Sequence, residues 1–263
     1  MDCVSIRHAS MDAESVSTDL DKRRIDRPLP RCLDARSVTR WPFEGGNMTA
    51  TQGRPADHWP VTTKNTALIV VDMQNIWVHP RGARYLPSSE DIVPNIRRLL
   101  DFCHAEKIPV IYLHTTKRKD LADVGIFADV KPQTHDADDE WSNFEGSAGA
   151  EIYEPVKPRA DDILVKKFRY SGFYGTQLEN LLRAMKRDTI AITGVATNVC
   201  CDSTARDGAM RDFKVLFLSD CNASFSRQEQ QATLNNFDKH FGVVMDSQTL
   251  VEKLAAGKVG ISE

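Results

Sequence analysis

Short apolar runs mark the strands that this sequence predicts. The first runs from Thr66 to Asp72 and is apolar at each position between its two ends. An unbroken run of this length is typical of a parallel strand that is covered on both faces. Five further runs are predicted as strands: 109–114, 162–167, 189–193, 214–219 and 243–245.

Between these runs, apolar residues recur at helical spacing. Ile92, Ile96, Leu99, Leu100 and Cys103 recur at intervals of three and four, and the same period predicts helices that contain Leu178 to Met185, 199–213 and 227–240. Strands and helices that alternate along a chain favour a three-layer α/β fold around a mostly parallel sheet.

Two long stretches lack either pattern. Residues 1–60 are rich in charge and proline, and we expect a disordered or surface-draped extension before a domain over 61–263. Met48 lies near the end of this stretch and is a candidate translation start. The polar segment 117–159 is too long for a simple connection. It is either a surface insertion or a cover over the active site that helps to choose the substrate.

Composition excludes several classes of protein. The 263 residues carry a net charge of −3, which argues against a nucleic-acid partner. No apolar run is long enough for a membrane span, and Met1 to Ser10 lack the apolar core of a secretory signal. The six cysteines have no framework spacing, which is typical of a reduced, cytoplasmic protein.

Reactive side chains follow three of the predicted strands. Asp72, Lys167 and Cys200 lie at or just beyond strand ends, and the carboxyl ends of parallel strands meet on one side of a sheet. A carboxylate could accept the thiol proton, and an ammonium could stabilise developing charge. Because Lys166 and Lys167 are neighbours on a strand, only one of them can point inward.

The predicted turn at 194–197 leads from a strand into a helix that carries Cys200. Asn198 could cap this helix. A thiol near a helix N-terminus loses its proton more easily, because the helix dipole favours negative charge there. These features favour Cys200 as a nucleophile, whereas Cys201 is expected to be a small core residue. A thiol-redox role for the Cys200–Cys201 pair is an alternative.

Three motifs carry a resemblance to a known family. Ala67 to Gln74, Lys167 to Phe173 and Thr193 to Cys200 resemble, in that order, the motifs of the isochorismatase-like cysteine hydrolases, and the similarity covers about residues 64–255. Within the family the chain is similar above all to ureidoacrylate amidohydrolases. Biuret and N-carbamoylsarcosine amidohydrolases are related.

The resemblance implies a doubly wound, Rossmann-like sheet and a catalytic triad of Asp72, Lys167 and Cys200. It selects Lys167 over Lys166. It also implies a cis peptide bond between Val195 and Ala196, with the backbone N–H groups of Ala196 and Cys200 forming an oxyanion hole. The expected activity is cleavage of a C–N bond in a small ureido or carbamoyl amide through a thioester. Homo-oligomers are common in the family and are expected here.

No cofactor or metal is expected. No G-x-G-x-x-G follows a strand, so the sheet does not imply a dinucleotide. The relatives that act on nicotinamide bind a metal through an aspartate and closely spaced histidines. The seven histidines here include no such close pair, and a metal site needs convergent ligands.

A small-molecule substrate is the expected partner. Amide and aromatic side chains near the triad are candidates for its pocket, since a ureido group offers both donors and an acceptor. The candidates are Gln74, Asn75, Trp77, Tyr170, Phe173 and Asn198. Gln74 and Asn75 could equally close the turn after the strand. Arg206 is expected to form a helix-surface ion pair with Asp202.

Two other functions stay open at this point. One is the vinyl-ether hydrolysis of an isochorismatase proper, against which the thiol of Cys200 argues. The other is a non-catalytic binding module of the same fold, against which the presence of Asp72, Lys167 and Cys200 argues.

Overall fold

The computed structural model describes residues 54–131 and 138–259, all of which belong to one compact unit, Gln52–Glu263. The predictions for residues 1–53, including the start at Met48, lie outside the described residues. So does the part of the long insertion at 132–137.

Six parallel strands form a single sheet in the order β3-β2-β1-β4-β5-β6. Their bounds are β1 Thr66–Val71, β2 Val110–Thr115, β3 Ile163–Lys167, β4 Thr189–Val195, β5 Lys214–Ala223 and β6 Val243–Met245. The strand order reverses direction between β1 and β4. In doubly wound folds, ligands bind outside the carboxyl ends of the strands at such a switch point. The predicted fold class is confirmed.

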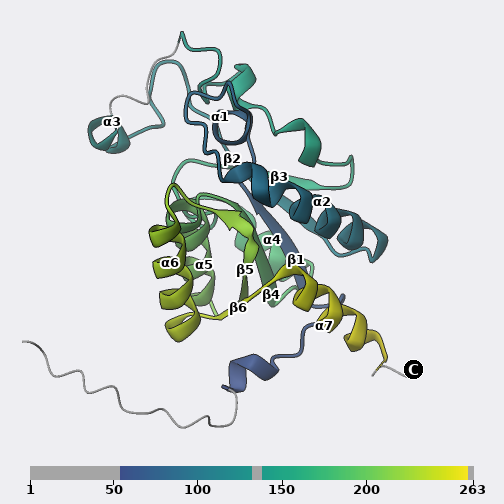
Figure 1. Ribbon diagram of the computed structural model, residues 1–263. Helices are drawn as coiled ribbons and strands as arrows, with labels where there is room; N and C mark the ends of the chain where they lie inside the picture. The colour runs from purple at the N-terminus through teal and green to yellow at the C-terminus, as the bar shows by residue number, and fades with distance from the viewer. Residues whose placement is uncertain (1–53, 132–137, 260–263) are drawn as a thin grey trace, which may run out of the picture. The chain divides into compact units, whose positions relative to one another are not determined.

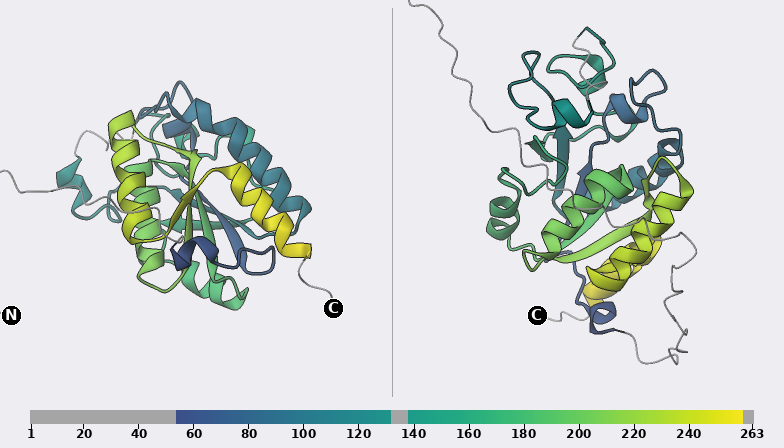
Figure 2. Two further views of the ribbon diagram at one scale, coloured as in Figure 1. Left: turned by 60° about the horizontal axis from the view of Figure 1, so that its bottom comes forward. Right: turned by 90° about the vertical axis from the view of Figure 1, so that its left-hand side faces the viewer.

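Helices cover both faces of the sheet (Figures 1 and 2). On one side lie α2 Ser89–Ala105 and α7 Ser247–Val259, and on the other lie α5 Asp202–Ala209 and α6 Arg227–His240. The short helix α4 Leu178–Ala184 packs on the second side through Leu178 and Leu182. Helix α7 was not expected from the sequence.

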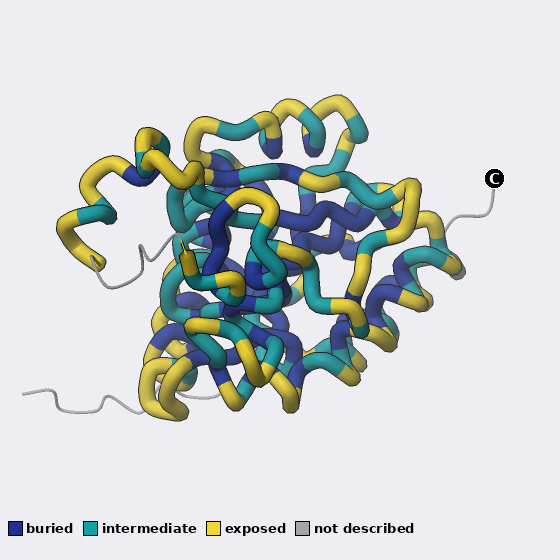
Figure 3. The backbone as a smooth tube through the Cα atoms, turned by 90° about the horizontal axis from the view of Figure 1, so that it is seen from above, coloured by how far each residue is buried: buried dark blue, intermediate teal, exposed yellow. Residues whose placement is uncertain are grey.

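The residues of β1 show why two layers of helices are needed. Leu68 and Val70 belong to the core under α2 and α7, whereas Ala67, Ile69 and Val71 belong to the core under α4, α5 and α6. Side chains alternate between the faces of a strand, so an apolar run buries both faces. Seen from above, the buried stretches lie inside the molecule and the exposed ones on its outer helix faces and loops (Figure 3).

The described chain begins with an ordered segment, 54–60, which the sequence assigned to a disordered or surface-draped extension. The segment contains a 3-10 helix, η1 Pro55–His58. Directly before this helix Arg54 donates a hydrogen bond to the Asp238 carboxylate at 3.0 Å, and directly after it Trp59 packs against the core. Residues 54–60 therefore belong to the folded domain. The sequence suggested otherwise because this segment has no periodic pattern.

The long insertion lies beyond the end of the sheet that is opposite η1 (Figures 1 and 2). Its short elements are α3 Phe127–Val130 and the 3-10 helices η3 Ala148–Ala150 and η4 Glu154–Val156, and the four-residue helix α1 Asn75–Val78 lies nearby. A ring stack between His79 and Trp141, with centroids 4.6 Å apart, joins the segment after α1 to the insertion. No helix in the described parts of the chain has both the length and the apolar character to cross a membrane.

Candidate active site

Asp72 and Lys167 form a buried ion pair at the carboxyl ends of β1 and β3. Lys167 Nζ lies 2.7 Å from Asp72 Oδ2, and the two side chains are 1% and 2% exposed. Asp72 has a φ of 49°, so the chain turns sharply directly after β1. Lys166, the alternative lysine, points away and pairs with Glu145. Strand alternation thus selects Lys167, as predicted.

Thr115, the last residue of β2, joins the two charges. Its hydroxyl accepts a hydrogen bond from Lys167 Nζ at 2.8 Å and donates one to Asp72 Oδ1 at 3.1 Å. The side chain of Gln74 holds Thr115 in place, because its amide bonds the Thr115 N–H at 2.8 Å and the Thr115 carbonyl at 3.0 Å. Sequence reasoning missed Thr115, although it ends a strand between the two that supply Asp72 and Lys167.

Cys200 lies in a π-helical turn, η5 Thr197–Cys201, directly after β4. Single π-helical turns are frequent at functional sites. The Val195–Ala196 peptide bond is cis, as expected. Gly194 has a φ of 113°, and a Cβ there would lie 2.0 Å from the Val71 carbonyl oxygen. Only glycine therefore lets β4 pass so close to β1 just before the nucleophile.

Helix α5 carries no side-chain cap from Asn198. Asn198 lies inside η5, and its Oδ1 accepts a hydrogen bond from Ser224 at 2.7 Å. The capping prediction was wrong because the helical turn starts after Ala196, two residues earlier than the motif suggested.

The Cys200 thiol holds its proton more tightly than a free cysteine. Burial raises its pKa, Asp72 raises it further and Lys167 lowers it, with the result that the pKa of Cys200 is raised to about 12. The prediction of a more acidic thiol was therefore wrong for this resting arrangement, because burial and a carboxylate outweigh the helix dipole. Thiolate formation here needs a proton acceptor.

Lys167 keeps its charge in spite of its burial. Burial alone would lower the pKa of Lys167, but the charge of Asp72 and the contact with Cys200 raise it above its ordinary value. The three side chains form one cluster, since Asp72 and Lys167 both lie close enough to shift the pKa of Cys200 and all three line the first cavity. Among the described residues, this cluster brings the predicted triad together.

Two adjoining cavities open over the triad. The first is lined by Asp72, Ile76, Trp77, Arg84, Thr115, Thr116, Lys117, Asp123, Val124, Phe127, Lys131, Asn143, Lys167, Phe168, Arg169, Tyr170 and Cys200. The second is lined by Asp72, Trp77, Arg84, Lys131, Tyr170, Val195, Ala196, Val199, Cys200 and Phe225. Cys200 thus faces open space, and the predicted wall residues Trp77 and Tyr170 line both cavities.

Four other predicted wall residues do not line these cavities. Gln74 is fully buried, and its side-chain amide is hydrogen-bonded to backbone groups. The Asn75 side chain donates to the Ala148 carbonyl at 2.9 Å. Phe173 packs against Phe213 in the core, and Asn198 is bonded to Ser224. They contact the surrounding chain instead of forming the cavity wall that the sequence predicted for them.

The long insertion lines the first cavity through Lys117 to Lys131 and through Asn143. Asn143 is 2% exposed, and its Nδ2 donates to the Thr115 carbonyl at 3.3 Å. Its Oδ1 and the indole N–H of Trp77 are buried without a hydrogen-bond partner among the described residues. These two atoms lie behind the cavity surface, although both residues line the first cavity. The sequence had no periodic signal that could single out Asn143.

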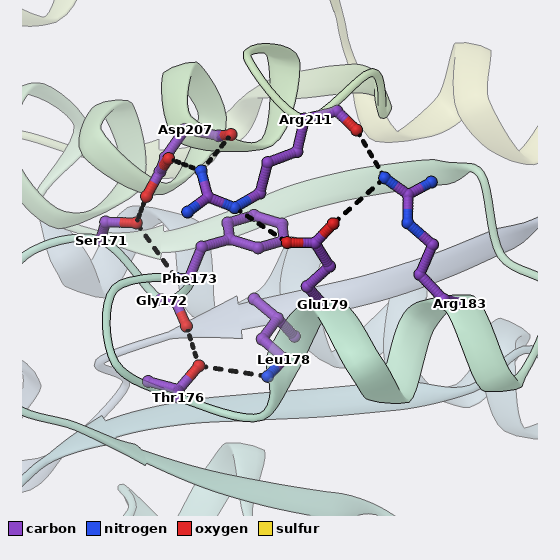
Figure 4. Close-up of polar contacts among 9 residues, drawn as sticks. All are labelled: Ser171, Gly172, Phe173, Thr176, Leu178, Glu179, Arg183, Asp207 and Arg211. Carbon is purple, nitrogen blue, oxygen red and sulfur yellow. Dashed lines mark hydrogen bonds and ion pairs between the residues drawn. The ribbon is translucent and has the colours of Figure 1, made fainter.

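A polar network ties the loop after β3 to helix α5, which follows the nucleophile (Figure 4). Ser171 Oγ bonds Asp207 Oδ2 at 2.6 Å, and Asp207 also pairs with Arg211. Behind it, the Gly172 N–H bonds Thr204 Oγ1 at 2.9 Å, and that hydroxyl donates to the Cys200 carbonyl at 2.7 Å. We call these contacts the loop–helix clamp; they link the loop after Lys167 to the turn that holds Cys200.

Other chemistry is limited in the parts of the chain that the structure describes. They contain no group of three or more His, Cys, Asp or Glu side chains placed to hold a metal ion, and the absence of a metal stays a prediction. Arg206 Nε lies 2.8 Å from Asp202, which confirms the expected ion pair. Cys201 is fully buried in the core, as predicted.

Comparison with known proteins agrees with this geometry. The model of the isochorismatase domain matches residues 66–249. The enterobactin synthase component B of Escherichia coli (strain K12) is 31% identical over 78% of this chain and 69% of that protein. The ureidoacrylate amidohydrolase RutB of Serratia proteamaculans (strain 568) is also 31% identical, over 73% of this chain and 84% of that protein.

A solved structure is similar over its whole length. A cysteine hydrolase from Pseudomonas syringae pv. phaseolicola 1448A is 35% identical, with a TM-score of 0.73 over 78% of this chain and 100% of that one. The shared domain, the sheet order and the buried cluster at its switch point lead to one conclusion: this chain belongs to the isochorismatase family and is a hydrolase.

Proposed function

We propose that this hydrolase is a cysteine amidohydrolase that cleaves a C–N bond of a small ureido or carbamoyl compound, with ureidoacrylate-like substrates first and biuret-like ones next. The observation that carries the proposal is the Cys200 thiol in contact with the buried Asp72–Lys167 pair at the floor of a cavity. The similarity to RutB supports the substrate class.

The first step makes the nucleophile. Asp72 accepts the proton of Cys200, and the thiolate attacks the ureido carbonyl. Lys167 stays protonated beside both groups, so the negative charge that moves from carboxylate to sulfur remains paired. The raised pKa of Cys200 fits this order, because the proton leaves only toward a positioned base.

The second half of the reaction releases the products. The N–H groups of Ala196 and Cys200, beside the cavity, are proposed to bind the oxyanion. Asp72 returns the proton to the leaving nitrogen, so that the C–N bond breaks and a thioester to Cys200 remains. Water then hydrolyses the thioester and restores the thiol. For a ureido acid the products are an amine and carbamate, and carbamate breaks down in water to ammonia and carbon dioxide.

The cavity wall complements a ureido group. Such a group carries N–H donors and one carbonyl acceptor. Trp77 and Asn143 line the cavity, so an indole ring and an amide stand near Cys200, and these are side chains suited to a planar group of this kind.

The test is ammonium release from ureidoacrylate, biuret, N-carbamoylsarcosine and nicotinamide, with Cys200→Ala as control. We expect turnover of one ureido or carbamoyl compound by the native enzyme. Cys200→Ala should lose it by at least about 1000-fold while its circular dichroism and Tm stay unchanged. Turnover that survives in Cys200→Ala would refute the nucleophile.

Vinyl-ether hydrolysis is the second candidate, favoured by the match to the isochorismatase domain over residues 66–249. Adding isochorismate to the panel separates the two functions. Cleavage of isochorismate without release of ammonium from any amide would favour this candidate over the amidohydrolase.

A further inference from the structure

We propose that Arg84 binds a carboxylate of the substrate, so that the enzyme acts on ureido or carbamoyl acids and discriminates against their neutral counterparts. The proposal rests on the proposed function for its substrate class. It assigns the specificity for the acid group to a residue outside the triad.

Arg84 shares both cavities with the nucleophile. Arg84 lines both cavities, as Asp72 and Cys200 do, and it is half buried. A molecule whose carbonyl lies at Cys200 can therefore reach the guanidinium within the same space. Arginine suits this task because its planar group holds a carboxylate through two parallel hydrogen bonds.

The backbone of Arg84 is fixed in position. Its N–H bonds the Ile76 carbonyl at 3.0 Å, and the N–H of Ala83 bonds the Trp141 carbonyl at 3.1 Å. Gly82, two residues before, packs so tightly that a Cβ there would lie 2.3 Å from the Asn75 carbonyl oxygen. Arg84 thus extends from the loop between α1 and α2, which is bonded to both α1 and the insertion. A backbone that is already fixed loses less entropy when a ligand binds.

The charge of Arg84 is not used within the described structure. Its guanidinium makes no ion pair with any carboxylate in residues 54–131 and 138–259. The two acidic residues of the first cavity are engaged elsewhere, since Asp72 pairs with Lys167 and Asp123 accepts from the Arg118 N–H at 3.2 Å.

Arg169 is the other arginine that lines the first cavity, and backbone carbonyls hold its guanidinium, whereas Arg206 lines neither cavity. Arg169 donates to the carbonyls of Asp123 at 3.1 Å and Phe168 at 2.7 Å, and Arg206 pairs with Asp202. Arg84 also lies close enough to Lys117 to help lower the pKa of that lysine to about 8, after burial as the main cause. Two cations facing one cavity repel each other, and a bound carboxylate relieves that repulsion.

The first experiment compares Arg84→Met with the native enzyme on two substrates that differ only in the acid group. These are ureidoacrylate and prop-1-enylurea, in which a methyl group replaces the carboxylate. We expect kcat/KM for the acid to fall by about 10- to 100-fold, the usual effect of losing a charged hydrogen bond. The value for the neutral compound should change by less than about three-fold. Equal loss on both substrates, or no loss on the acid, would overturn the proposal.

Arg97→Met is the matched control. It removes the same charge from an exposed position on α2 that lines neither cavity. We expect it to leave the preference for the acid unchanged. If Arg97→Met lowers turnover of the acid as much as Arg84→Met does, net charge rather than a binding contact is responsible, and the proposal fails.

A binding measurement separates this proposal from the proposed function. Ureidoacrylate is titrated by calorimetry into Cys200→Ala and into Cys200→Ala with Arg84→Met. Binding that weakens at least about 10-fold with the second substitution supports Arg84 even if the native enzyme releases no ammonium. Absence of binding to Cys200→Ala, or equal binding to both variants, overturns the role of Arg84.

Discussion

Asp72 and Lys167 show how a buried charge pair can be tolerated at a reactive site. Both side chains are almost completely buried, where an unpaired charge would cost several kcal/mol. Each charge is met by the other and by the hydroxyl of Thr115. The pair therefore persists without solvent, and the nearby thiol experiences both a base and a cation.

The opposed effects of these two charges on Cys200 lead to a test of its protonation. Asp72 raises the pKa of Cys200 and Lys167 lowers it, so Asp72→Asn should lower that pKa and increase the thiolate fraction. At one pH between 7 and 9, Cys200 should then react with iodoacetamide several-fold faster than in the native enzyme. Turnover should fall at least about 100-fold, because the base is lost.

Peptide mass spectrometry identifies the alkylated cysteine, and Lys167→Met serves as the opposite control. Removing the cation should slow alkylation of Cys200 at the same pH. Alkylation that slows in Asp72→Asn would contradict the inference that the charge of Asp72 raises the pKa of Cys200.

At the same scale, sequence reasoning succeeded where chemistry and position coincide. Asp72, Lys167 and Cys200 are reactive groups at strand ends, so strand prediction brought them to one edge of the sheet, and the resemblance decided between Lys166 and Lys167. Gln74 and Phe173 were misplaced because the motif that contains them also builds the scaffold. Whether a side chain points into a cavity or into the core depends on packing, which residue type alone does not reveal.

Among the elements, the loop after β3 and helix α5 depend on each other. Ser171 and Asp207 lie far apart in the chain and meet in the loop–helix clamp (Figure 4). Gly208 permits the close approach, since a Cβ there would lie 2.9 Å from Ile190 Cδ1 and 3.1 Å from Phe173 Cε2. The resemblance drew attention to the loop after β3, and the structure shows that this loop depends on helix α5.

Asp207→Asn tests the clamp. It weakens the contacts to both Ser171 and Arg211. We expect a loss of about 1 kcal/mol in the free energy of unfolding, typical of partly exposed charged contacts. A several-fold fall in kcat should accompany it, because the turn that holds Cys200 loses its link to the loop. Denaturant unfolding and steady-state kinetics measure the two effects.

Glu179→Gln is the matched control for the clamp. Glu179 pairs with Arg183 and Arg211 on the outer surface but does not contact Ser171 or Gly172. It should cost similar stability and leave kcat within about two-fold, as expected for a surface contact. An equal fall of kcat in both variants would show that general stability, not the clamp, sets the rate.

Sheet elements were the best predicted, and the irregular elements the least. Each predicted strand is present, although β5 continues to Ala223, past a bulge that Asn222 bridges by bonding the Ile192 carbonyl at 2.9 Å. Helix α7 was missed and α5 is shorter than expected, because the π-helical turn occupies the start of the predicted helix. The spacing of apolar residues along the sequence does not show where hydrogen bonding changes from π-helical to α-helical.

For the whole molecule, the described residues contain both cores and the full catalytic cluster. A variant that lacks residues 1–53 should therefore fold and keep kcat/KM within about three-fold, since no triad or cavity residue is removed. A variant that lacks residues 1–61 should be destabilised by about 2–4 kcal/mol, because Trp59 and Val61 pack against the core and Arg54 bonds Asp238.

Thermal unfolding and the ammonium assay compare these two deletions. Loss of activity in the shorter deletion, with Tm unchanged, would show that residues 1–53 contribute to the reaction. Equal Tm in both deletions would contradict the packing role of residues 54–61.

At the switch point, different parts of the chain supply the catalytic residues and the cavity wall, and this has a consequence for evolution and engineering. Chemistry comes from the ends of β1, β2, β3 and β4, whereas most of the remaining wall comes from the segment between Ile76 and Arg84 and from the insertion. Loops tolerate exchange far better than strands. Grafting these two segments from a homologue should therefore change the substrate specificity, while the catalytic residues at the strand ends stay the same.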